Sequence, residues 1–428
     1  MKQRIAVVGS GIAGLASAWW LSKRHEVTLF ERNDYLGGHT HTHDIELEGR
    51  RLAVDSGFIV FNPLHYPLLT TLFDELGVAS QPTTMSFSVH DAGSGLEYNA
   101  RSLHTLFCQR RNLVSPAFWR MLLDIRRFYR EAPALLSGDA DGPTLGDYLA
   151  QGGYRRLFVH DHLVPMAAAL WSSPASNALD FPARYLVQFM SNHQMLQATG
   201  RAPWHVVSGG SARYVDAMRT RWQVRERIGH AVHAVHRRGD GVLIDSTAGQ
   251  ERFDQVVLAC HSDQALALLT DADAVEREVL GAIRYQSNDA VLHTDERLLP
   301  RNRKAWAAWN AHVPATPGAA CTVSYWMNLL QGIDSARPLI VTLNRNDAIR
   351  PDRVLRTMRY SHPVHDHAMV RAQARRGEIQ GRRKTWFAGA YWGWGFHEDG
   401  IRSAYEMVGA MEATPHRDKA TPATVEAA

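Results

Sequence analysis

A glycine-rich run near the start of the chain, Gly9-Ser10-Gly11-Ile12-Ala13-Gly14, has the residue types and spacing that bind a dinucleotide. In such a run Gly9 permits a tight turn, Gly11 lets backbone N–H groups approach a pyrophosphate, and Gly14 lets a helix pack on a strand. The N-terminus of that helix, where Ile12 and Ala13 lie, carries partial positive charge and faces the phosphates. The run therefore predicts a dinucleotide-binding site.

An acidic residue, Glu31, stands where a carboxylate can accept hydrogen bonds from ribose hydroxyls. A negative charge there disfavours a 2′-phosphate, so NADP is not expected. The elements that would position these groups follow in order: an apolar strand at residues 5–8, a helix with one apolar side, and a second strand at residues 27–30. This pattern is common to NAD and FAD sites.

The residues that follow separate the two cofactors. Arg32 leads to Gly37-Gly38-His39-Thr40 and then to Asp55-Ser56-Gly57-Phe58. This order resembles the amine oxidase superfamily of flavoproteins, which includes phytoene desaturases and protoporphyrinogen oxidases. The resemblance implies that the cofactor is FAD, with the double glycine running along it and Gly57 and Phe58 near the flavin ring. His39 stands where the family often has arginine, so this contact departs from the family pattern.

The other end of the chain resembles the second FAD motif of the same superfamily. Residues 385–389 read as a strand that ends at Gly389, and residues 401–411 read as a helix. The resemblance places Gly389 beside the ribityl chain and points the helix N-terminus at the flavin pyrimidine. Gly400 and Ile401 would offer backbone N–H groups there, and the helix dipole would stabilise the reduced flavin.

His397 lies between this strand end and the helix, which would place it close to the flavin. An imidazole titrates near neutrality and can take or give a proton, so His397 is the candidate catalytic residue. Glu398 is the alternative base. In a second interpretation the two residues are a helix cap and a first-turn acid that only position the cofactor.

The chain is too long for one hydrophobic core, so two or more domains are expected. The predicted fold is α/β, with a Rossmann-like parallel-sheet FAD-binding domain assembled from discontinuous segments and an α+β substrate domain. Residues 206–269 would supply strands at 228–235, 242–246 and 253–259, and by resemblance Val232 would touch the adenine. The expected FAD-binding segments are 1–61, 206–269 and 381–413, the substrate segments are 62–205 and 270–380, and the tail 414–428 is expected to be disordered.

Several stretches, most of all residues 393–400 (GWGFHEDG), resemble a bacterial group of predicted NAD/FAD-binding proteins linked to fatty acyl modification. Many amine oxidases carry a lysine near flavin N5, and the comparable strand at residues 288–293 has none. The resemblance therefore implies a desaturase of a lipid-like small molecule, fatty acyl or isoprenoid, acting by hydride transfer to N5. A flavin-dependent amine oxidase and a redox-neutral isomerase or hydratase are the alternatives.

Composition bounds the other functions. The net charge of +4 is spread along the chain, so nucleic acid is not an expected partner. Three scattered cysteines and no apolar run of about 18 residues indicate a cytoplasmic protein. The histidines at 39, 41 and 43 and at 362, 365 and 367 lack cysteine or acidic partners at metal-site spacing, so no metal is expected. The basic, apolar helix after Ser115 reads as a core helix or as a peripheral contact with the inner membrane face.

Overall fold

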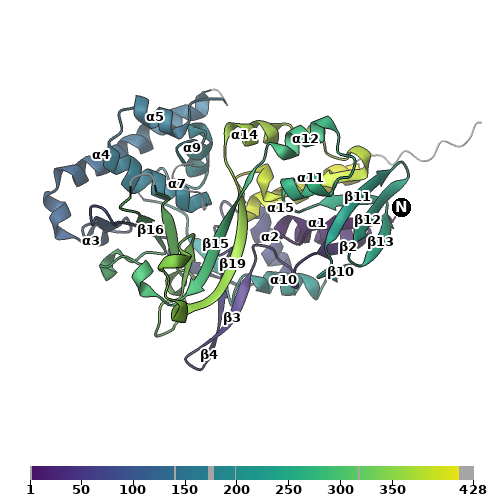
Figure 1. Ribbon diagram of the computed structural model, residues 1–428, viewed down its shortest axis with the longest axis horizontal. Coiled ribbons are helices and arrows are strands. Elements are labelled where there is room, and N and C mark those ends of the chain that lie inside the picture. Colours follow the sequence, from purple (N-terminus) through teal and green to yellow (C-terminus); the bar gives the residue numbers. More distant parts are fainter. Residues whose placement is uncertain (1, 139–140, 172–177, 198, 317–318, 414–428) are drawn as a thin grey trace, which may run out of the picture.

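The computed structural model describes residues 2–138, 141–171, 178–197, 199–316 and 319–413 (Figure 1). The segment 414–428, which the sequence predicted to be disordered, lies outside the described residues. The chain forms two units that lie side by side along the long axis of the molecule, with long strands running between them.

A five-stranded parallel sheet forms the core of the first unit, and it confirms the predicted α/β class. Alternate residues of its central strand enter different cores, with Ile5 and Val7 on one face and Ala6 and Val8 on the other. Because both faces are covered, the strand is continuously apolar. In sheet order the strands are β10 (Val224–Ile228), β2 (Glu26–Glu31), β1 (Arg4–Val8), β14 (Gln255–Leu258) and β20 (Thr385–Phe387).

Helices cover both faces of this sheet. The core on one face contains α1 (Ile12–Ser22), α2 (Pro67–Leu76), α10 (Ala212–Arg219) and α15 (His397–Ala413). The core on the other face contains α11 (Ser262–Leu268), α12 (Ala274–Gly281) and α14 (His367–Ala374). Three of these helices, α2, α12 and α14, come from segments that the sequence analysis assigned to the substrate domain, although they pack with the nucleotide unit.

A three-stranded antiparallel sheet also packs against the second face. It contains β11 (Val232–Arg238), β12 (Gly241–Ser246) and β13 (Gly249–Phe253). The single strand predicted at 228–235 is wrong, because the chain turns at Gly229, where φ is +74°, and divides it between β10 and β11. The strand predicted at 253–259 is shorter, at Gln255–Leu258, and β13 precedes it.

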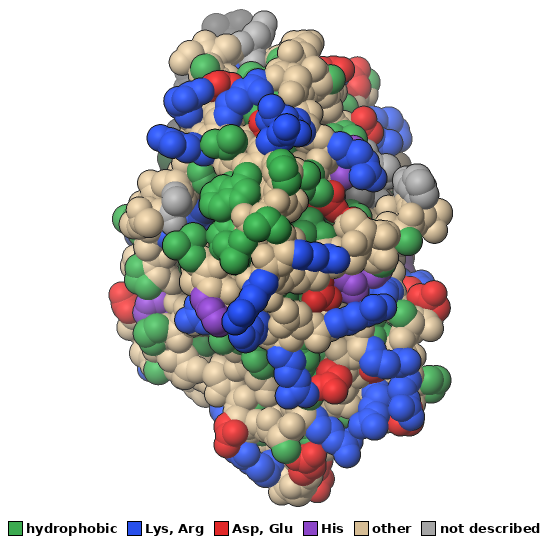
Figure 2. All heavy atoms as spheres, turned by 90° about the vertical axis from the view of Figure 1, so that its left-hand side faces the viewer, with side chains coloured by type: hydrophobic (Ala, Val, Ile, Leu, Met, Phe, Trp, Pro, Cys, Tyr) green, Lys and Arg blue, Asp and Glu red, His purple; other side chains and the backbone are tan. Residues whose placement is uncertain are grey.

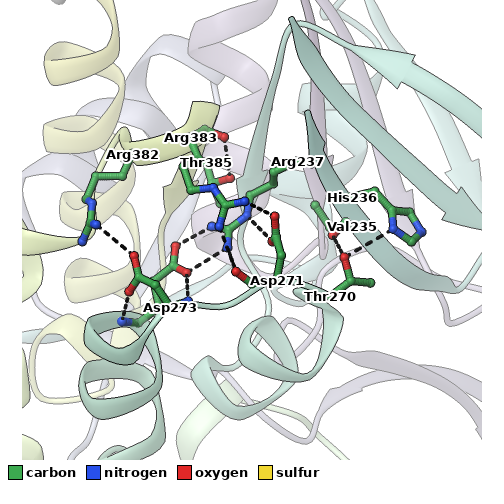
Figure 3. A network of polar contacts seen from close by, with 10 residues as sticks. Val235, His236, Arg237, Thr270, Asp271, Asp273, Arg382, Arg383 and Thr385 are labelled. Atoms are coloured by element: carbon green, nitrogen blue, oxygen red, sulfur yellow. Dashed lines mark hydrogen bonds and ion pairs between the residues drawn. The ribbon is translucent and has the colours of Figure 1, made fainter. Parts of the chain in front are cut away.

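An ionic network around the buried side chain of Arg237 joins this small sheet to its neighbours (Figure 3). The Arg237 guanidinium on β11 binds the Glu276 carboxylate on α12, and both side chains are buried. It also donates to Asp271 Oδ1 at 2.7 Å. Arg383, just before β20, also binds Asp271, and Arg382 lies 2.9 Å from Asp273. The network therefore connects three segments that are distant in sequence.

The second unit is built on a seven-stranded sheet that is antiparallel except for the β16–β7 pair. Its first two strands are long and lie between the two units (Figure 1). In sheet order the strands are β19 (Val354–Pro363), β15 (Tyr285–His293), β18 (Ile340–Leu343), β17 (Thr322–Trp326), β16 (Trp309–Val313), β7 (Phe87–Asp91) and β8 (Glu97–Asn99).

Helices cover this second sheet. The Ser115 hydroxyl accepts from the Phe118 N–H at 3.3 Å and so caps the helix that follows it, with Pro116 at the first helical position. Among the described residues, no helix has the length and apolar content needed to cross a membrane. The helices are α3 (Leu103–Leu106), α4 (Pro116–Glu131), α5 (Leu145–Gln151), α6 (Arg156–Phe158), α7 (Val164–Trp171), α9 (Ala183–Asn192) and α13 (Met327–Gln331).

Two small antiparallel sheets complete the fold. One is the hairpin of β3 (Thr42–Leu47) and β4 (Arg50–Asp55). The other contains β5 (Val60–Phe61), β9 (Trp204–Val207) and β6 (Ser80–Thr83).

Candidate cofactor and active site

Each of the three glycines of the first loop is glycine for a different physical reason. Gly9 follows β1 with φ of +100°, in the left-handed region that favours glycine. A Cβ at Gly14 would lie 1.9 Å from the Gly9 carbonyl oxygen, so only glycine lets α1 pack here. At Gly11 a Cβ would meet nothing within 4 Å, and this residue lines a cavity. Gly11 is therefore the point where a ligand can approach the backbone.

The Glu31 carboxylate at the end of β2 is held against this loop. It accepts hydrogen bonds from the Ser10 N–H at 3.0 Å, the Ser10 hydroxyl at 2.6 Å and the Asn33 N–H at 2.9 Å. Glu31 and Arg32 both line the cavity. These bonds fix a negative charge beside the start of α1, where a ribose would follow the phosphates.

A second and third loop close on the first. Gly37 and Gly38 have φ of +125° and +58°, and a Cβ at Gly38 would lie 3.1 Å from Gly11 Cα. The Phe58 N–H donates to the His39 carbonyl at 2.7 Å, and a Cβ at Gly57 would lie 2.1 Å from the same oxygen. The loops therefore approach one another backbone to backbone, which requires glycine at these points.

These loops line a cavity of about 660 Å³, a volume typical of cofactor pockets. Both units contribute to its wall, since Val232 comes from β11 and Trp309 comes from the seven-stranded sheet. Gly14, Thr40, Gly400 and Ile401 were predicted to bind the cofactor but do not line it. The predicted residues that do line it are Gly9, Gly11, Ile12, Ala13, Glu31, Arg32, Gly37, Gly38, His39, Gly57, Phe58, Val232 and Gly389.

The last helix, α15, begins at His397, earlier than the predicted start at Ile401. The Asp399 carboxylate accepts from the Phe396 N–H at 2.9 Å and so caps the earlier turn. The Gly400 N–H donates to the Phe396 carbonyl at 3.1 Å, so the prediction that Gly400 offers this group to the cofactor is wrong. Ile401 lies one residue further into the helix. First-turn N–H groups before Gly400 are the ones without an intrahelical acceptor.

Gly400 has a packing role instead. A Cβ at this position would lie 2.6 Å from Ile12 Cγ2 on α1, which is closer than side chains approach. The glycine thus lets α15 lie against α1 beside the cofactor loop. Gly389, at the end of β20, lines the cavity, and its N–H donates to the Ser403 hydroxyl on α15 at 2.8 Å.

His397 lines the cavity in the first turn of α15. Its ring stacks on Phe58 with centroids 3.6 Å apart, and its Nε2 lies 2.9 Å from the Thr40 hydroxyl oxygen. That hydroxyl lies 2.6 Å from the Tyr214 hydroxyl, so Thr40 binds these side chains. Burial, followed by the nearby His39, holds the pKa of His397 well below its usual range. The expectation that His397 titrates near neutrality is therefore wrong, and its ring is neutral there.

Glu398 points away from the cavity. Its carboxylate accepts the N–H groups of Leu68 at 3.2 Å and Leu69 at 3.1 Å, in the first turn of α2. Arg402 donates to it at 3.0 Å. Burial raises the pKa of Glu398, while these hydrogen bonds lower it. The interpretation of Glu398 as a catalytic base is corrected, because its oxygens cap a neighbouring helix and do not line the cavity.

A group of histidine and tyrosine side chains lines the cavity near His39, and the sequence analysis did not assign it there. The His39 ring centroid lies 4.9 Å from that of Tyr360 and 5.2 Å from that of His362. Burial lowers the pKa of His362 to about 3 and that of His261 to about 4. Tyr360 and His362 alternate on β19, so a strand with period two would have placed them on one face.

Of the remaining histidines of the two sequence groups, His365 also lines the cavity, while the other three have partners elsewhere. His41 stacks on Tyr35 with centroids 4.1 Å apart, and His43 lies 2.8 Å from the Ser56 hydroxyl. His367 lies 2.9 Å from the Gly142 carbonyl oxygen. Within the described parts of the chain, no group of three or more His, Cys, Asp or Glu side chains could hold a metal ion.

Most of the side chains on the wall opposite the nucleotide loops are aromatic or aliphatic, and β19 adds Arg359, Ser361 and His362 to this wall. Among the described residues that line the cavity, Glu31 is the only carboxylate and there is no lysine. Glu31 belongs to the nucleotide side, so the opposite side has neither group. The apolar side chains on this side are Leu170, Trp171, Trp309, Tyr325, Leu343, Trp394 and Phe396.

The residues present fit FAD. Gly11 exposes its backbone to the cavity at the N-terminus of α1, which suits a pyrophosphate. Glu31 supplies the carboxylate for a ribose. The His39 Nε2 atom is buried with no hydrogen-bond partner among the described residues, so it is available to a bound group. When bound, FAD accepts two electrons from the substrate as a hydride.

A parallel-sheet dinucleotide unit whose cavity is closed by a second, mixed α+β unit is an architecture that suits a flavin-binding protein. Comparison with known families agrees with this architecture. The sequence profile of the flavin containing amine oxidoreductases matches residues 12–329. The chain belongs to this family.

Individual relatives show what the chain is similar to. It is 26% identical over 283 residues to the putative flavin-containing monoamine oxidase AofH of Mycobacterium tuberculosis, across 62% of this chain and 59% of that protein. A shorter stretch of 77 residues is 47% identical to the 1-hydroxycarotenoid 3,4-desaturase of Flavobacterium sp., across 18% of this chain and 14% of that protein. The chain thus matches less than two thirds of the length of these relatives.

Among solved structures, the fold is similar to that of the CLA-producing fatty acid isomerase from P. acnes. The TM-score is 0.66 at 16% sequence identity, over 95% of this chain and 98% of that chain. At this identity the comparison establishes the fold.

Proposed function

We propose that this oxidoreductase desaturates an apolar, lipid-like substrate, either a fatty acyl or an isoprenoid chain. The observation that carries the proposal is the group of aromatic and aliphatic side chains on the cavity wall opposite the nucleotide loops, which contains no carboxylate and no lysine. Such a wall suits a hydrocarbon chain, because its burial there removes apolar surface from water. The similarity of part of the chain to a carotenoid desaturase supports the same substrate class.

Amine oxidation is the less favoured alternative. Its support is the similarity to AofH, a protein described as a putative monoamine oxidase. An amine is cationic at neutral pH, and binding it in an enclosed site calls for a carboxylate or a similar partner. Among the described residues of the cavity wall, Glu31 is the only carboxylate, and its oxygens already accept bonds from Ser10 and Asn33.

The proposed reaction removes two hydrogens from adjacent carbons, one as a hydride and one as a proton, and leaves a double bond. The aromatic wall would hold the chain in one orientation and exclude water from the reacting carbons. His397 is the proposed acceptor of the proton because it lines the cavity, although its lowered pKa makes it a weaker base than a free imidazole. The Thr40 and Tyr214 hydroxyls lie next to it in a hydrogen-bonded chain.

Anaerobic mixing of the purified holoprotein with single substrates tests the proposal. Free fatty acids, phospholipid-linked acyl chains and a carotenoid precursor would be compared with putrescine and cyclohexylamine, and flavin bleaching would be followed by absorbance. We expect bleaching by at least one apolar chain, together with a new double bond in the product. Bleaching by an amine alone would overturn the proposal. A double bond that moves without any bleaching or electron acceptor would instead identify a redox-neutral isomerase.

The variant Trp394→Ala is a sharper version of this test, because Trp394 lines the apolar wall. The matched control is Trp222→Ala, since Trp222 is only partly buried and packs against the core of the nucleotide unit. Loss of bleaching by the apolar substrate in the first variant and not in the second would support the proposal.

A further inference from the structure

Exposed apolar side chains gather at one end of the second unit. We call the surface formed by α3, the short helix Arg110–Val114 and the first half of α4 the tip face. Leu103 is 76% exposed, Val114 is 83% exposed and Leu123 is 61% exposed. Leu113 and Trp119 are about half exposed. Most of the large hydrophobic side chains that stand exposed in the described residues therefore lie within 21 positions of the sequence, Leu103 to Leu123.

The apolar residues of the tip face form one surface. The Trp119 indole N–H donates to the Leu113 carbonyl at 2.8 Å, and the Trp119 ring centroid lies 5.4 Å from that of Phe107. Trp119 and Leu123 are four positions apart on α4, so they lie on the same side of that helix. Figure 2 looks at this end of the molecule and shows a continuous group of hydrophobic side chains bordered by Lys and Arg.

Packing of the protein does not account for these residues. α4 already has a buried face, which includes Phe118, Met121 and Phe128. Trp119 and Leu123 lie on the outside and form a second apolar strip on the same helix. Contiguous exposed apolar surface of this kind marks an interaction site.

The charge around the apolar surface is almost entirely positive. Residues 101–130 contain seven arginines and a single acidic residue, Asp124. Asp124 is buried and its carboxylate already binds Arg155 at 2.9 Å. The arginines at 101, 110, 120 and 126 are exposed, and no ion pair holds them within the described chain. Guanidinium groups bind phosphate with two parallel hydrogen bonds, so this border suits a phosphate-rich surface.

We propose that the tip face docks on an anionic membrane surface. Leu103, Val114, Trp119 and Leu123 would enter the boundary between headgroups and acyl chains, while the surrounding arginines bind lipid phosphates. A second copy of this chain is a poorer occupant, because a two-fold contact would bring the same arginines of both copies together. The docking proposal rests on the proposed function in one respect. If the substrate is an acyl chain, it would come from the membrane that the tip face contacts.

Vesicle binding tests the docking separately from the chemistry. The full-length, FAD-loaded protein would be floated with vesicles of phosphatidylcholine alone or of phosphatidylcholine with phosphatidylglycerol. We expect binding to the anionic vesicles, weakening as salt rises, and little binding to the neutral ones. The double variants Val114→Ser/Leu123→Ser and Arg110→Glu/Arg120→Glu should each bind about tenfold or more weakly.

Two matched controls accompany these variants. Leu64, on the other unit, is 62% exposed, so Leu64→Ser removes the same amount of exposed apolar surface as Leu123→Ser. Arg238→Glu reverses one exposed charge at the end of β11. Both should bind anionic vesicles as well as the unchanged protein does.

Several outcomes would overturn the docking proposal: equal binding to both vesicle types, no binding to either, or tip-face variants that bind like the controls. A dimer in solution that dissociates on Leu123→Ser would assign the tip face to a second copy. Flavin bleaching by a detergent-dispersed substrate needs no membrane, so failure of the proposed function and failure of the docking would be told apart.

Discussion

The nucleotide side of the cavity is walled mainly by backbone, whereas the opposite side is walled by large side chains. Gly9, Gly11, Gly38 and Gly57 bring three loops within van der Waals contact on the first side. On the second side the tryptophans at 171, 309 and 394 come from α7, from β16 and from the segment before α15. A wall made of backbone binds the groups of a cofactor that are always the same. A wall made of side chains can differ between related proteins that bind different substrates.

The two sides also differ in polarity. The nucleotide side presents helix N-termini, the Glu31 carboxylate and Arg32, which suit charged phosphates and ribose hydroxyls. The opposite side presents apolar rings, and the histidines nearest to it are neutral because burial lowers their pKa values. One cavity thus joins a polar side, which fits the cofactor, to a more apolar side, where we propose that the substrate binds.

Breaking the buried ion pair of the nucleotide unit should have the largest effect of the predicted changes, a loss of unfolding free energy. Arg237→Met leaves the Glu276 carboxylate buried without its partner, which we expect to cost about 3–5 kcal/mol of unfolding free energy. Chemical denaturation would measure it, with Arg225→Met as the control, since Arg225 is 56% exposed and should cost less than about 1 kcal/mol. Equal losses in the two variants would contradict the assignment of the buried network as a stabilising link.

A pair of glycine substitutions should separate packing from cofactor approach on the nucleotide side. Gly14→Ala puts a Cβ 1.9 Å from a backbone oxygen and should cost about 3 kcal/mol of stability. In Gly11→Ala the Cβ meets nothing within 4 Å, so the apoprotein should keep its stability and lose bound FAD. Thermal unfolding of the apoprotein and flavin content after purification would be measured. Similar stability losses in both variants would show that Gly11 also serves packing.

On the substrate side, Trp394→Ala should leave FAD content unchanged and lower kcat/KM for an apolar substrate. Loss of one large aromatic wall residue corresponds to about 2 kcal/mol, or roughly 30-fold. Steady-state kinetics with flavin content as the reference would measure it, and Trp394→Phe should recover most of the activity. Loss of FAD in Trp394→Ala would contradict the separation of the cavity into a cofactor side and a substrate side.

The pH dependence of stability should show the smallest effect. Burial lowers the pKa of His365, which is 1% exposed, from 6.5 to about 3. Above pH 6.5 the residue is neutral in both states and costs nothing; as pH falls from 6.5 towards about 3, only the unfolded chain takes up a proton. Stability should therefore fall by about 1.4 kcal/mol per pH unit from this residue.

His365→Phe tests this prediction in the same window. The variant should show a shallower loss of unfolding free energy with acid, measured by chemical denaturation at several pH values. An unchanged slope would mean that His365 takes up its proton in the folded protein as readily as in the unfolded one.

The sequence predicts the nucleotide unit well, because the residues that specify this unit lie close together in the chain. The strand, glycine loop, helix and Glu31 follow one another within 31 residues, and each has a physical role that its residue type reveals. The boundary of α15 was missed for an equally local reason: Gly400 disfavours a helix interior, but the Asp399 cap and the close contact with Ile12 outweigh it.

The side of the cavity opposite the nucleotide loops was harder to predict, because its residues meet only in the folded chain. Trp171 and His365 lie with ring centroids 5.1 Å apart although they come from distant segments, and no periodicity in the sequence pairs them. Glu398 shows the same limit, since its partner helix begins at Pro67, far away along the chain. Local patterns place a residue on an element, whereas its partners depend on how the elements pack.

The strand order of the parallel sheet has a consequence for synthesis on the ribosome. The central strand β1 is made first, yet its neighbour β14 pairs Gln255 with Ile5. At about 5–20 residues per second, the 250 residues between these partners take roughly 12 to 50 s to synthesise. During that time one edge of β1, an apolar strand, lacks its native neighbour. The nascent chain would depend on chaperones or on transient pairing to keep that edge covered until β14 emerges.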